Sequence, residues 1–231
     1  MAKSNDRRLD LTLLWCGVVA PVAYFAIQPI AALFYDEYSF LRDDASTLGT
    51  PESGFPELFN YGTLGVGLLL LFSAIGVARS LPRAGGRQWI GWLVVLAIVA
   101  GAVGCLNACV FPLPHQRHTS GLLASIGMGF FVLPLVLPFV FGRSPATARI
   151  RMCFWINLMV LVSLVPIVSG LIQRVAGAWD IELVWFQAFL NNGSGLLQRV
   201  AAAVVFLPVG VLCWFLLAIK DRASVATRVA S

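Results

Sequence analysis

The residues that could carry out chemistry lie in loops between apolar segments rather than inside those segments. The first such loop contains Asp43, Asp44 and Ser46, and the third contains both histidines of the chain, His115 and His118. A serine near a histidine can act as a nucleophile with its general base, and histidine with aspartate can bind a metal ion that activates water. An arginine at a helix end can hold a lipid phosphate. The other charged candidates in these loops are Arg117, Arg174, Asp180, Glu182 and Arg199.

Each group also has an ordinary structural explanation. The His115-x-x-His118 spacing lacks the H-E-x-x-H context of a helical zinc site, so we expect neither a metal ion nor a cofactor. Asp43 and Asp44 suit a turn or a helix cap at least as well as catalysis. The arginines can simply pair with the eight acids in the same loops. Whether the protein is an enzyme is therefore left open by these residues.

The composition places these loops in a membrane protein. Hydrophobic residues make up 59% of the 231 residues, and charged residues only 12%, about half the usual share of a soluble domain. This excludes a nucleic-acid-binding protein, a disordered chain and a secreted disulfide scaffold. The five cysteines all fall in apolar segments and include no C-x-x-C pair, so we expect no disulfide framework.

Six apolar segments are long enough to cross a bilayer, which takes about 20 residues. None contains Asp, Glu, Lys or Arg, and a helix is the element that satisfies its own backbone in lipid. The predicted fold class is therefore an all-α membrane protein, a bundle of six transmembrane helices. The predicted spans are Leu11–Phe34, Leu58–Ala78, Gln88–Phe111, Ser120–Gly142, Met152–Gln173 and Val200–Ile219.

Charge asymmetry predicts the orientation of this bundle. Twelve of the sixteen basic residues lie in the two tails and the even-numbered loops, whereas eight of the eleven acids lie in the odd-numbered loops. Basic residues mark the cytoplasmic side, so both termini are predicted to be cytoplasmic. The expected organisation is a tail over residues 1–10, a membrane domain over 11–219 and a tail over 220–231, in the plasma or inner membrane.

Two local patterns add detail. Trp179 and Trp185 stand in an amphipathic stretch of the fifth loop, which predicts a short helix at the outer interface, with a re-entrant segment as the alternative. Ala97, Gly101 and Cys105 recur every four residues on the third span and form a stripe of small side chains. Such stripes let helices approach closely, either within the chain or against a membrane-protein partner or a second copy.

The order of several short motifs resembles a known membrane-protein family, domain of unknown function 998. The motifs are Ser46-Thr47-Leu48-Gly49, Asn60, Phe111-Pro112, His118 and Gly195-Leu196-x-x-Arg199, arranged around six helices from about Leu11 to Ile219. The resemblance implies a six-helix prokaryotic membrane protein and no particular reaction. It singles out six positions, namely Ser46, Gly49, Asn60, Pro112, His118 and Arg199.

The leading functional hypothesis is a polar pocket at the extracytoplasmic face that binds a lipid headgroup or a small ligand. Its predicted residues are Asp44, Ser46, Asn60, His118, Arg174 and Arg199. The alternatives are a membrane-embedded hydrolase or lipid-modifying enzyme that uses Asp44, Ser46 and His118, and an accessory subunit that packs through the small-residue stripe. Membrane lipids are the expected partners, and nucleic acid is not.

Overall fold

The computed structural model describes residues 2–168 and 184–229, and these residues are predominantly helical. The α-helices are α1 (Ala2–Ala32), α2 (Pro56–Ser80), α3 (Gln88–Val110), α4 (Leu122–Met128), α5 (Val132–Val136), α6 (Ala148–Val168), α8 (Val184–Asn192) and α9 (Ser194–Val229). Short 3-10 helices are η1 (Ala45–Gly49), η2 (Pro82–Ala84), η3 (Gln116–His118), η4 (Gly129–Phe131), η5 (Leu137–Phe139) and η6 (Pro145–Thr147). Over these ranges the chain forms no strand beyond an isolated antiparallel bridge between Gly86 and Phe141.

Six helical stretches are long and apolar enough to cross a membrane, which confirms the predicted fold class. They cover residues 6–32, 56–80, 88–110, 116–139, 145–167 and 194–220. The helices extend beyond the apolar segments at several ends, because α1 already begins at Ala2 and α9 at Ser194. The chain is a multi-pass membrane protein.

The fourth span is broken where the others are continuous. Between Leu122 and Phe139 it passes through α4, η4, α5 and η5, each a few residues long. Pro134 and Pro138 lie in this stretch, and each removes a backbone donor from the helix and crowds the preceding turn. Helices α1, α6 and α9 continue through their own prolines.

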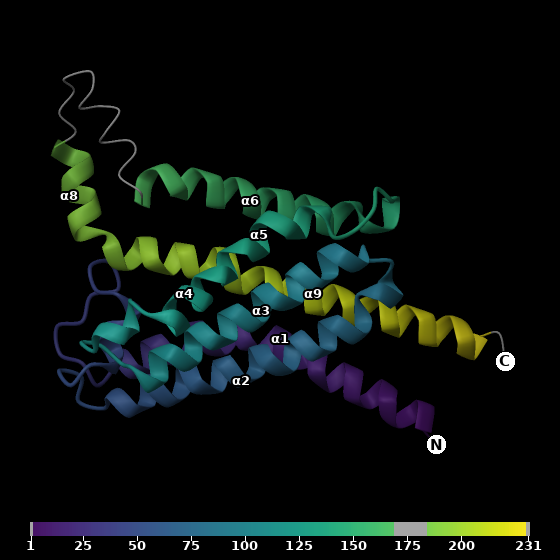
Figure 1. Cartoon of the computed structure of the whole chain (residues 1–231), viewed down its shortest axis with the longest axis horizontal. Coiled ribbons are helices and arrows are strands. Elements are labelled where there is room, and N and C mark those ends of the chain that lie inside the picture. Colours follow the sequence, from purple (N-terminus) through teal and green to yellow (C-terminus); the bar gives the residue numbers. More distant parts are fainter. Residues whose placement is uncertain (1, 169–183, 230–231) are drawn as a thin grey trace.

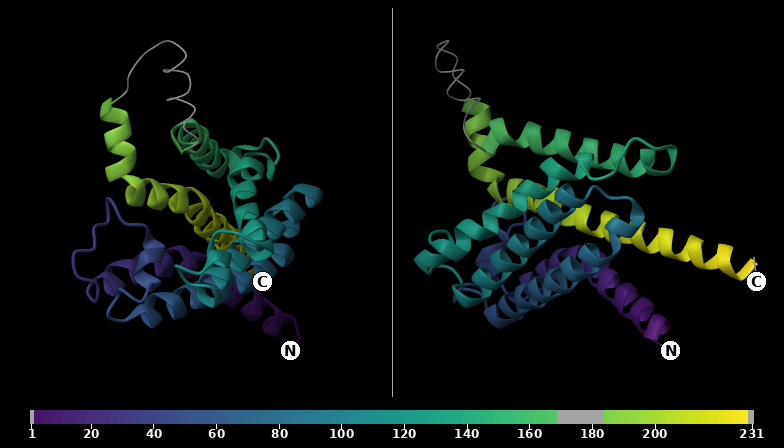
Figure 2. Two further views of the ribbon diagram at one scale, coloured as in Figure 1. Left: turned by 60° about the vertical axis from the view of Figure 1, so that its left-hand side comes forward. Right: turned by 45° about the vertical axis from the view of Figure 1, so that its right-hand side comes forward.

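The long helices form a bundle with two distinct ends. Helices α1, α2, α3 and α9 pack side by side, and α6 packs along α9 (Figures 1 and 2). The start of α1, the end of α9 and the α2–α3 and α5–α6 turns lie at one end, which we call the basic end (Figure 1). The first loop (residues 33–55) and α8 lie at the other, which we call the capped end.

Small residues bring the third span against its neighbours. Ala97, Gly101 and Cys105 are buried, and a Cβ added to Gly101 would lie 2.6 Å from Cδ1 of Phe130. A Cβ on Gly127 of α4 would lie 2.7 Å from the Cα of Gly104. The stripe therefore serves close packing inside the chain, and a partner on it stays a prediction.

The fifth loop contains the short helix that its composition predicts. Helix α8 spans Val184–Asn192 and includes Trp185, and it stands at an angle to α9 at the capped end (Figure 1). Trp179 lies outside the described residues. Phe186 is buried, whereas Val184 and Phe189 are exposed, so the helix presents an apolar surface outward.

Candidate functional site

At the capped end the first loop is held on the start of α9 by Arg199. Its guanidinium donates from one Nη to the carbonyls of Phe40 (3.0 Å), Asp43 (2.9 Å) and Gly195 (2.8 Å). The other Nη donates to the Tyr38 hydroxyl, and the same cation lies 4.9 Å from the centre of the Phe40 ring. Arg199 therefore serves as a clamp on the loop backbone.

The turn before Arg199 completes this clamp. Ala45 donates its backbone N–H to Oε1 of Gln198 (2.6 Å), and Ser194 donates its hydroxyl to the carbonyl of Arg42 (2.6 Å). A Cβ on Gly195 would overlap the carbonyl oxygen of Asp43. The loop can approach α9 this closely because position 195 has no side chain.

Asn60 holds the other end of η1. Its Nδ2 donates to the carbonyl of Gly49 (3.1 Å), and a Cβ on Gly49 would overlap Oδ1 of Asn60. Leu48 and Ala45 pack under the loop with Phe59 of α2. The short helix that carries Ser46 is thus fixed at both ends, by Gln198 and by Asn60.

A cavity of about 270 Å³ lies beneath η1, between α1, α2, α3, α4 and α9. Ser46 and His118 line it, and so does Gln198. The rest of the wall is mostly apolar, with Tyr24 stacked on Phe206 at a centroid distance of 4.2 Å. Among the described residues that line this cavity there is no Lys, Arg, Asp or Glu.

The third loop fixes the orientation of His118. Its Nδ1 lies 2.8 Å from the carbonyl oxygen of Phe111, so Nδ1 is the donor, and in the neutral ring Nε2 is then the acceptor. Nδ2 of Asn107 binds the carbonyls of Arg117 (3.2 Å) and His118 (3.0 Å). His115 is engaged elsewhere, because its Nδ1 accepts the backbone N–H of Arg117.

The two aspartates of the first loop have different roles. Oδ2 of Asp43 accepts the backbone N–H of Ser39 (2.7 Å), which is a turn contact. Asp44 precedes η1 without a side-chain cap bond, and its carbonyl accepts the Tyr38 hydroxyl (3.1 Å). Burial raises the pKa of the Asp44 carboxyl, and the charge of Asp43 adds to this, although Arg199 opposes it.

The predicted residues therefore divide into two groups. Ser46 and His118 share one cavity, whereas Asn60 and Arg199 hold backbone carbonyls of the first loop. Asp44 lies beside the clamp and is not among the residues that line the cavity. Arg174, Asp180 and Glu182 lie outside the described residues. Among the side chains that the structure describes, no three of His, Cys, Asp or Glu cluster as metal ligands would.

Sequence reasoning missed two residues of this region and one at the opposite end. Gln198 stands between Gly195 and Arg199, three residues after the glycine and so on the same helix face. Tyr38 carried no signal beyond its place in an acidic loop. Asp10 was expected to be an ordinary tail residue, yet it is buried and binds three cations.

Comparisons with known proteins give a family but no described relative. A family model described as a protein of unknown function, DUF998, matches residues 18–215. No curated protein and no solved structure matches the chain. The match covers all six spans, the first and sixth in part, and includes every motif position discussed above.

Proposed function

The chain belongs to the DUF998 family, and from that premise we propose that its cavity binds a small uncharged amphiphile at the extracytoplasmic end of the bundle. The observation that carries the proposal is the lining of the cavity. Aromatic and aliphatic groups form most of the wall, and Ser46, His118 and Gln198 supply polar groups. Ligand sites typically combine an apolar wall with a few convergent polar groups.

The size and charge of the cavity narrow the ligand class. A volume of about 270 Å³ falls just below the usual range of about 300–1,000 Å³ for small-molecule sites. It accommodates a short apolar group or one end of a lipid rather than a whole lipid. Because no formally charged group is among the described residues of the wall, we propose as the polar end a hydroxyl that donates to Nε2 of His118, or a carbonyl that accepts from the Ser46 hydroxyl.

The orientation is part of the same proposal. The basic end carries most of the lysines and arginines, which favours the cytoplasmic side for that end and for both termini. The capped end then faces outward, in a plasma or inner membrane. A reporter fused to the C-terminus should be active only in the cytoplasm, and an external C-terminus would overturn this orientation.

The positions of Ser46, His118 and Asp44 favour ligand binding over hydrolysis. A serine nucleophile needs its base within hydrogen-bond reach, about 2.6–3.2 Å. Among the described residues, no hydrogen bond joins Ser46 to His118, whose Nδ1 is engaged by Phe111. Asp44 is not in the cavity wall and does not orient the histidine. Hydrolysis is therefore the competing activity, and ester cleavage by the protein would reveal it.

The test is photolabelling of the full chain in nanodiscs with a diazirine derivative of decanol. We expect labelled residues on the cavity wall, and about a tenfold loss of this labelling in Ala202→Phe, which fills the cavity. Ala203→Phe on the same turn is the matched control, because Ala203 does not line the cavity. His118→Ala or Ser46→Ala should weaken labelling about three- to tenfold, the usual range for one hydrogen bond.

Two results would overturn the proposal. Equal labelling in Ala202→Phe and Ala203→Phe would show that the probe reports only lipid contact at the outer surface. Cleavage of the acetate ester of the same probe, with cleavage abolished in Ser46→Ala, would replace a binding protein with a hydrolase.

A further inference from the structure

A second cavity lies at the basic end, away from the one described above. Its volume is about 410 Å³, and it is lined by Arg87, Pro138, Phe139, Phe141, Arg143, Arg151 and Trp155. Three of the seven lining residues are arginines and none is an acid. Two loops and the first turn of α6 supply these cations, and Arg87 is distant in the sequence from Arg143 and Arg151.

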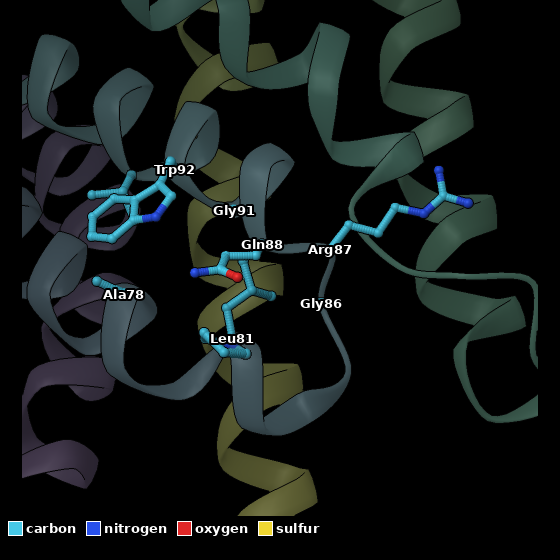
Figure 3. A pocket seen from close by; sticks show the side chains of 9 residues that line it. Ala78, Leu81, Gly86, Arg87, Gln88, Gly91 and Trp92 are labelled. Atoms are coloured by element: carbon cyan, nitrogen blue, oxygen red, sulfur yellow. The ribbon is translucent and has the colours of Figure 1, made fainter.

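Backbone pairing holds the arginines of the two loops together. Gly86 and Phe141 form an antiparallel bridge, and Arg87 donates its backbone N–H to the carbonyl of Val140 (2.8 Å). This pairing joins the α2–α3 turn to the α5–α6 turn. In Figure 3 the Arg87 side chain extends away from Leu81 and Trp92, which line a smaller cavity, and toward the neighbouring green ribbon.

Arg151 supplies the third cation from a position that favours an anion. It lies in the first turn of α6, where the helix dipole adds positive potential and disfavours a cation. Its Nε is buried and has no hydrogen-bond partner. Among the side chains that the structure describes, each ion pair involves Asp6 or Asp10, and none includes Arg87, Arg143 or Arg151.

The apolar side of the cavity indicates where the anion comes from. Phe139 and Trp155 meet edge to face with centroids 5.2 Å apart, and both remain partly exposed, at 45% and 37%. Trp155 stands one turn after Arg151 in α6, and tryptophan near the end of a membrane span is typical of the membrane–water interface. An anion at this place would have cationic groups on one side and aromatic rings toward the lipid on the other.

We propose that this cavity binds the phosphate of an anionic membrane lipid at the basic end of the bundle. Guanidinium groups bind phosphate oxygens through paired hydrogen bonds, and basic pockets between helices on the cytoplasmic side recognise lipid headgroups. A phosphate among the three guanidinium groups offsets the repulsion among these cations. Phe139 and Trp155 contact the glycerol and upper acyl region of the same lipid.

The proposal goes beyond the general attraction of basic loops to acidic membranes. That attraction depends on the number of cations and not on their placement. A built site depends on Arg87, Arg143 and Arg151, and is indifferent to Arg149, which lines a different cavity between α6 and α9. Arg149→Gln is therefore a control with the same helix and the same change in charge.

The experiment is native mass spectrometry of the full chain from nanodiscs that contain equal phosphatidylglycerol and phosphatidylcholine. We expect a bound phosphatidylglycerol, and about a tenfold loss of its affinity in Arg151→Gln and in Arg143→Gln, as removal of one charge-assisted contact predicts. Arg151→Lys should be intermediate, because it keeps the charge but not the paired donors. Arg149→Gln should retain the lipid.

Three outcomes would overturn the proposal. The first is an equal loss in Arg149→Gln and Arg151→Gln, which indicates general surface charge. The second is no preference for phosphatidylglycerol over phosphatidylcholine. The third is displacement of the lipid by excess inorganic phosphate, which identifies a free-anion site instead. Because Arg143 is exposed, Arg143→Gln should fold normally, and unchanged thermal unfolding of that variant checks this.

Discussion

The two ends of the bundle are closed by opposite means. At the basic end the Asp10 carboxylate, only 3% exposed, binds Arg79 (2.5 Å), Arg83 (2.8 Å) and Lys220 (2.8 Å). At the capped end a single cation, Arg199, is held by three neutral carbonyls and the Tyr38 hydroxyl. One closure gathers cations around an anion, and the other gathers backbone oxygens around a cation.

The contacts at the basic end therefore depend on charge, whereas the contacts at the capped end depend on the shape of the backbone. Asp10 joins α1 to α2, to the α2–α3 turn and to α9, and its partners can be held only by a negative charge at that position. The carbonyls around Arg199 are held in place by the course of the first loop, which depends on the close approach at Gly195. We therefore expect loss of a charge to open the basic end, and an added methyl group to open the capped end.

The largest loss of stability to unfolding should come from Asp10→Asn. The substitution leaves Arg79, Arg83 and Lys220 beside a neutral amide, and removal of one partner from a buried ion pair costs about 3–5 kcal/mol. Arg79 and Arg83 keep contact with solvent, so we expect the lower limit, about 3 kcal/mol. Unfolding in detergent measures this loss. Asp6→Asn is the control, because Asp6 is 71% exposed and lies 3.5 Å from Arg79, and an equal loss there would remove the special role of Asp10.

A smaller effect is expected from Gly195→Ala at the capped end. The new methyl group overlaps the Asp43 carbonyl, and forcing extra atoms into a packed site costs about 1–3 kcal/mol. Hydrogen exchange should increase at residues 39–45, where the loop leaves α9. Gly65→Ala is the matched control, because nothing lies within 4 Å of a Cβ there.

The same experiment tests whether the two closures are independent. Distant substitutions without shared partners add in their effects on stability. Asp10→Asn should therefore leave exchange at residues 39–45 unchanged, although it lowers the stability of the whole chain more. Increased exchange at residues 39–45 in Asp10→Asn, or no increase there in Gly195→Ala, would show that the two ends are not stabilised independently in these two ways.

The sequence predicted the spans well because hydrophobic length and the absence of charge are local properties. The family resemblance singled out Gly49, Asn60 and Arg199 and included Gly195 in one of its motifs, and these residues hold the first loop in the structure. What it could not predict is the partner of each group. Arg199 could have bound a lipid phosphate, and only the course of the first loop brings carbonyls to it instead.

The two clusters at the basic end show the same limit. The number of basic residues in each loop predicted the orientation of the bundle. It could not predict that three arginines line one cavity, because the Gly86–Phe141 pairing that joins their loops leaves no periodic pattern in the sequence. Asp10 directly precedes the first apolar segment, so the sequence assigns it to the tail. Its burial depends on Arg79 and Lys220, which lie on helices distant in the sequence. Long-range pairing is therefore the missing information in each case.

The smallest expected effect on stability concerns Asp44, a carboxylate at the capped end whose pKa is raised by burial. A raised pKa in the folded state means that ionisation opposes folding, so this penalty is absent below the ordinary value of 3.8 and appears as the pH rises through the folded pKa. Asp44→Asn should raise the melting temperature at pH 7 by on the order of 1–2 °C, since solvent screens a half-buried group. Below about pH 3.8 the two proteins should melt together. A lower melting temperature for Asp44→Asn at pH 7 would instead assign its charge a stabilising contact with Arg199, and the capped end would then depend on charge as the basic end does.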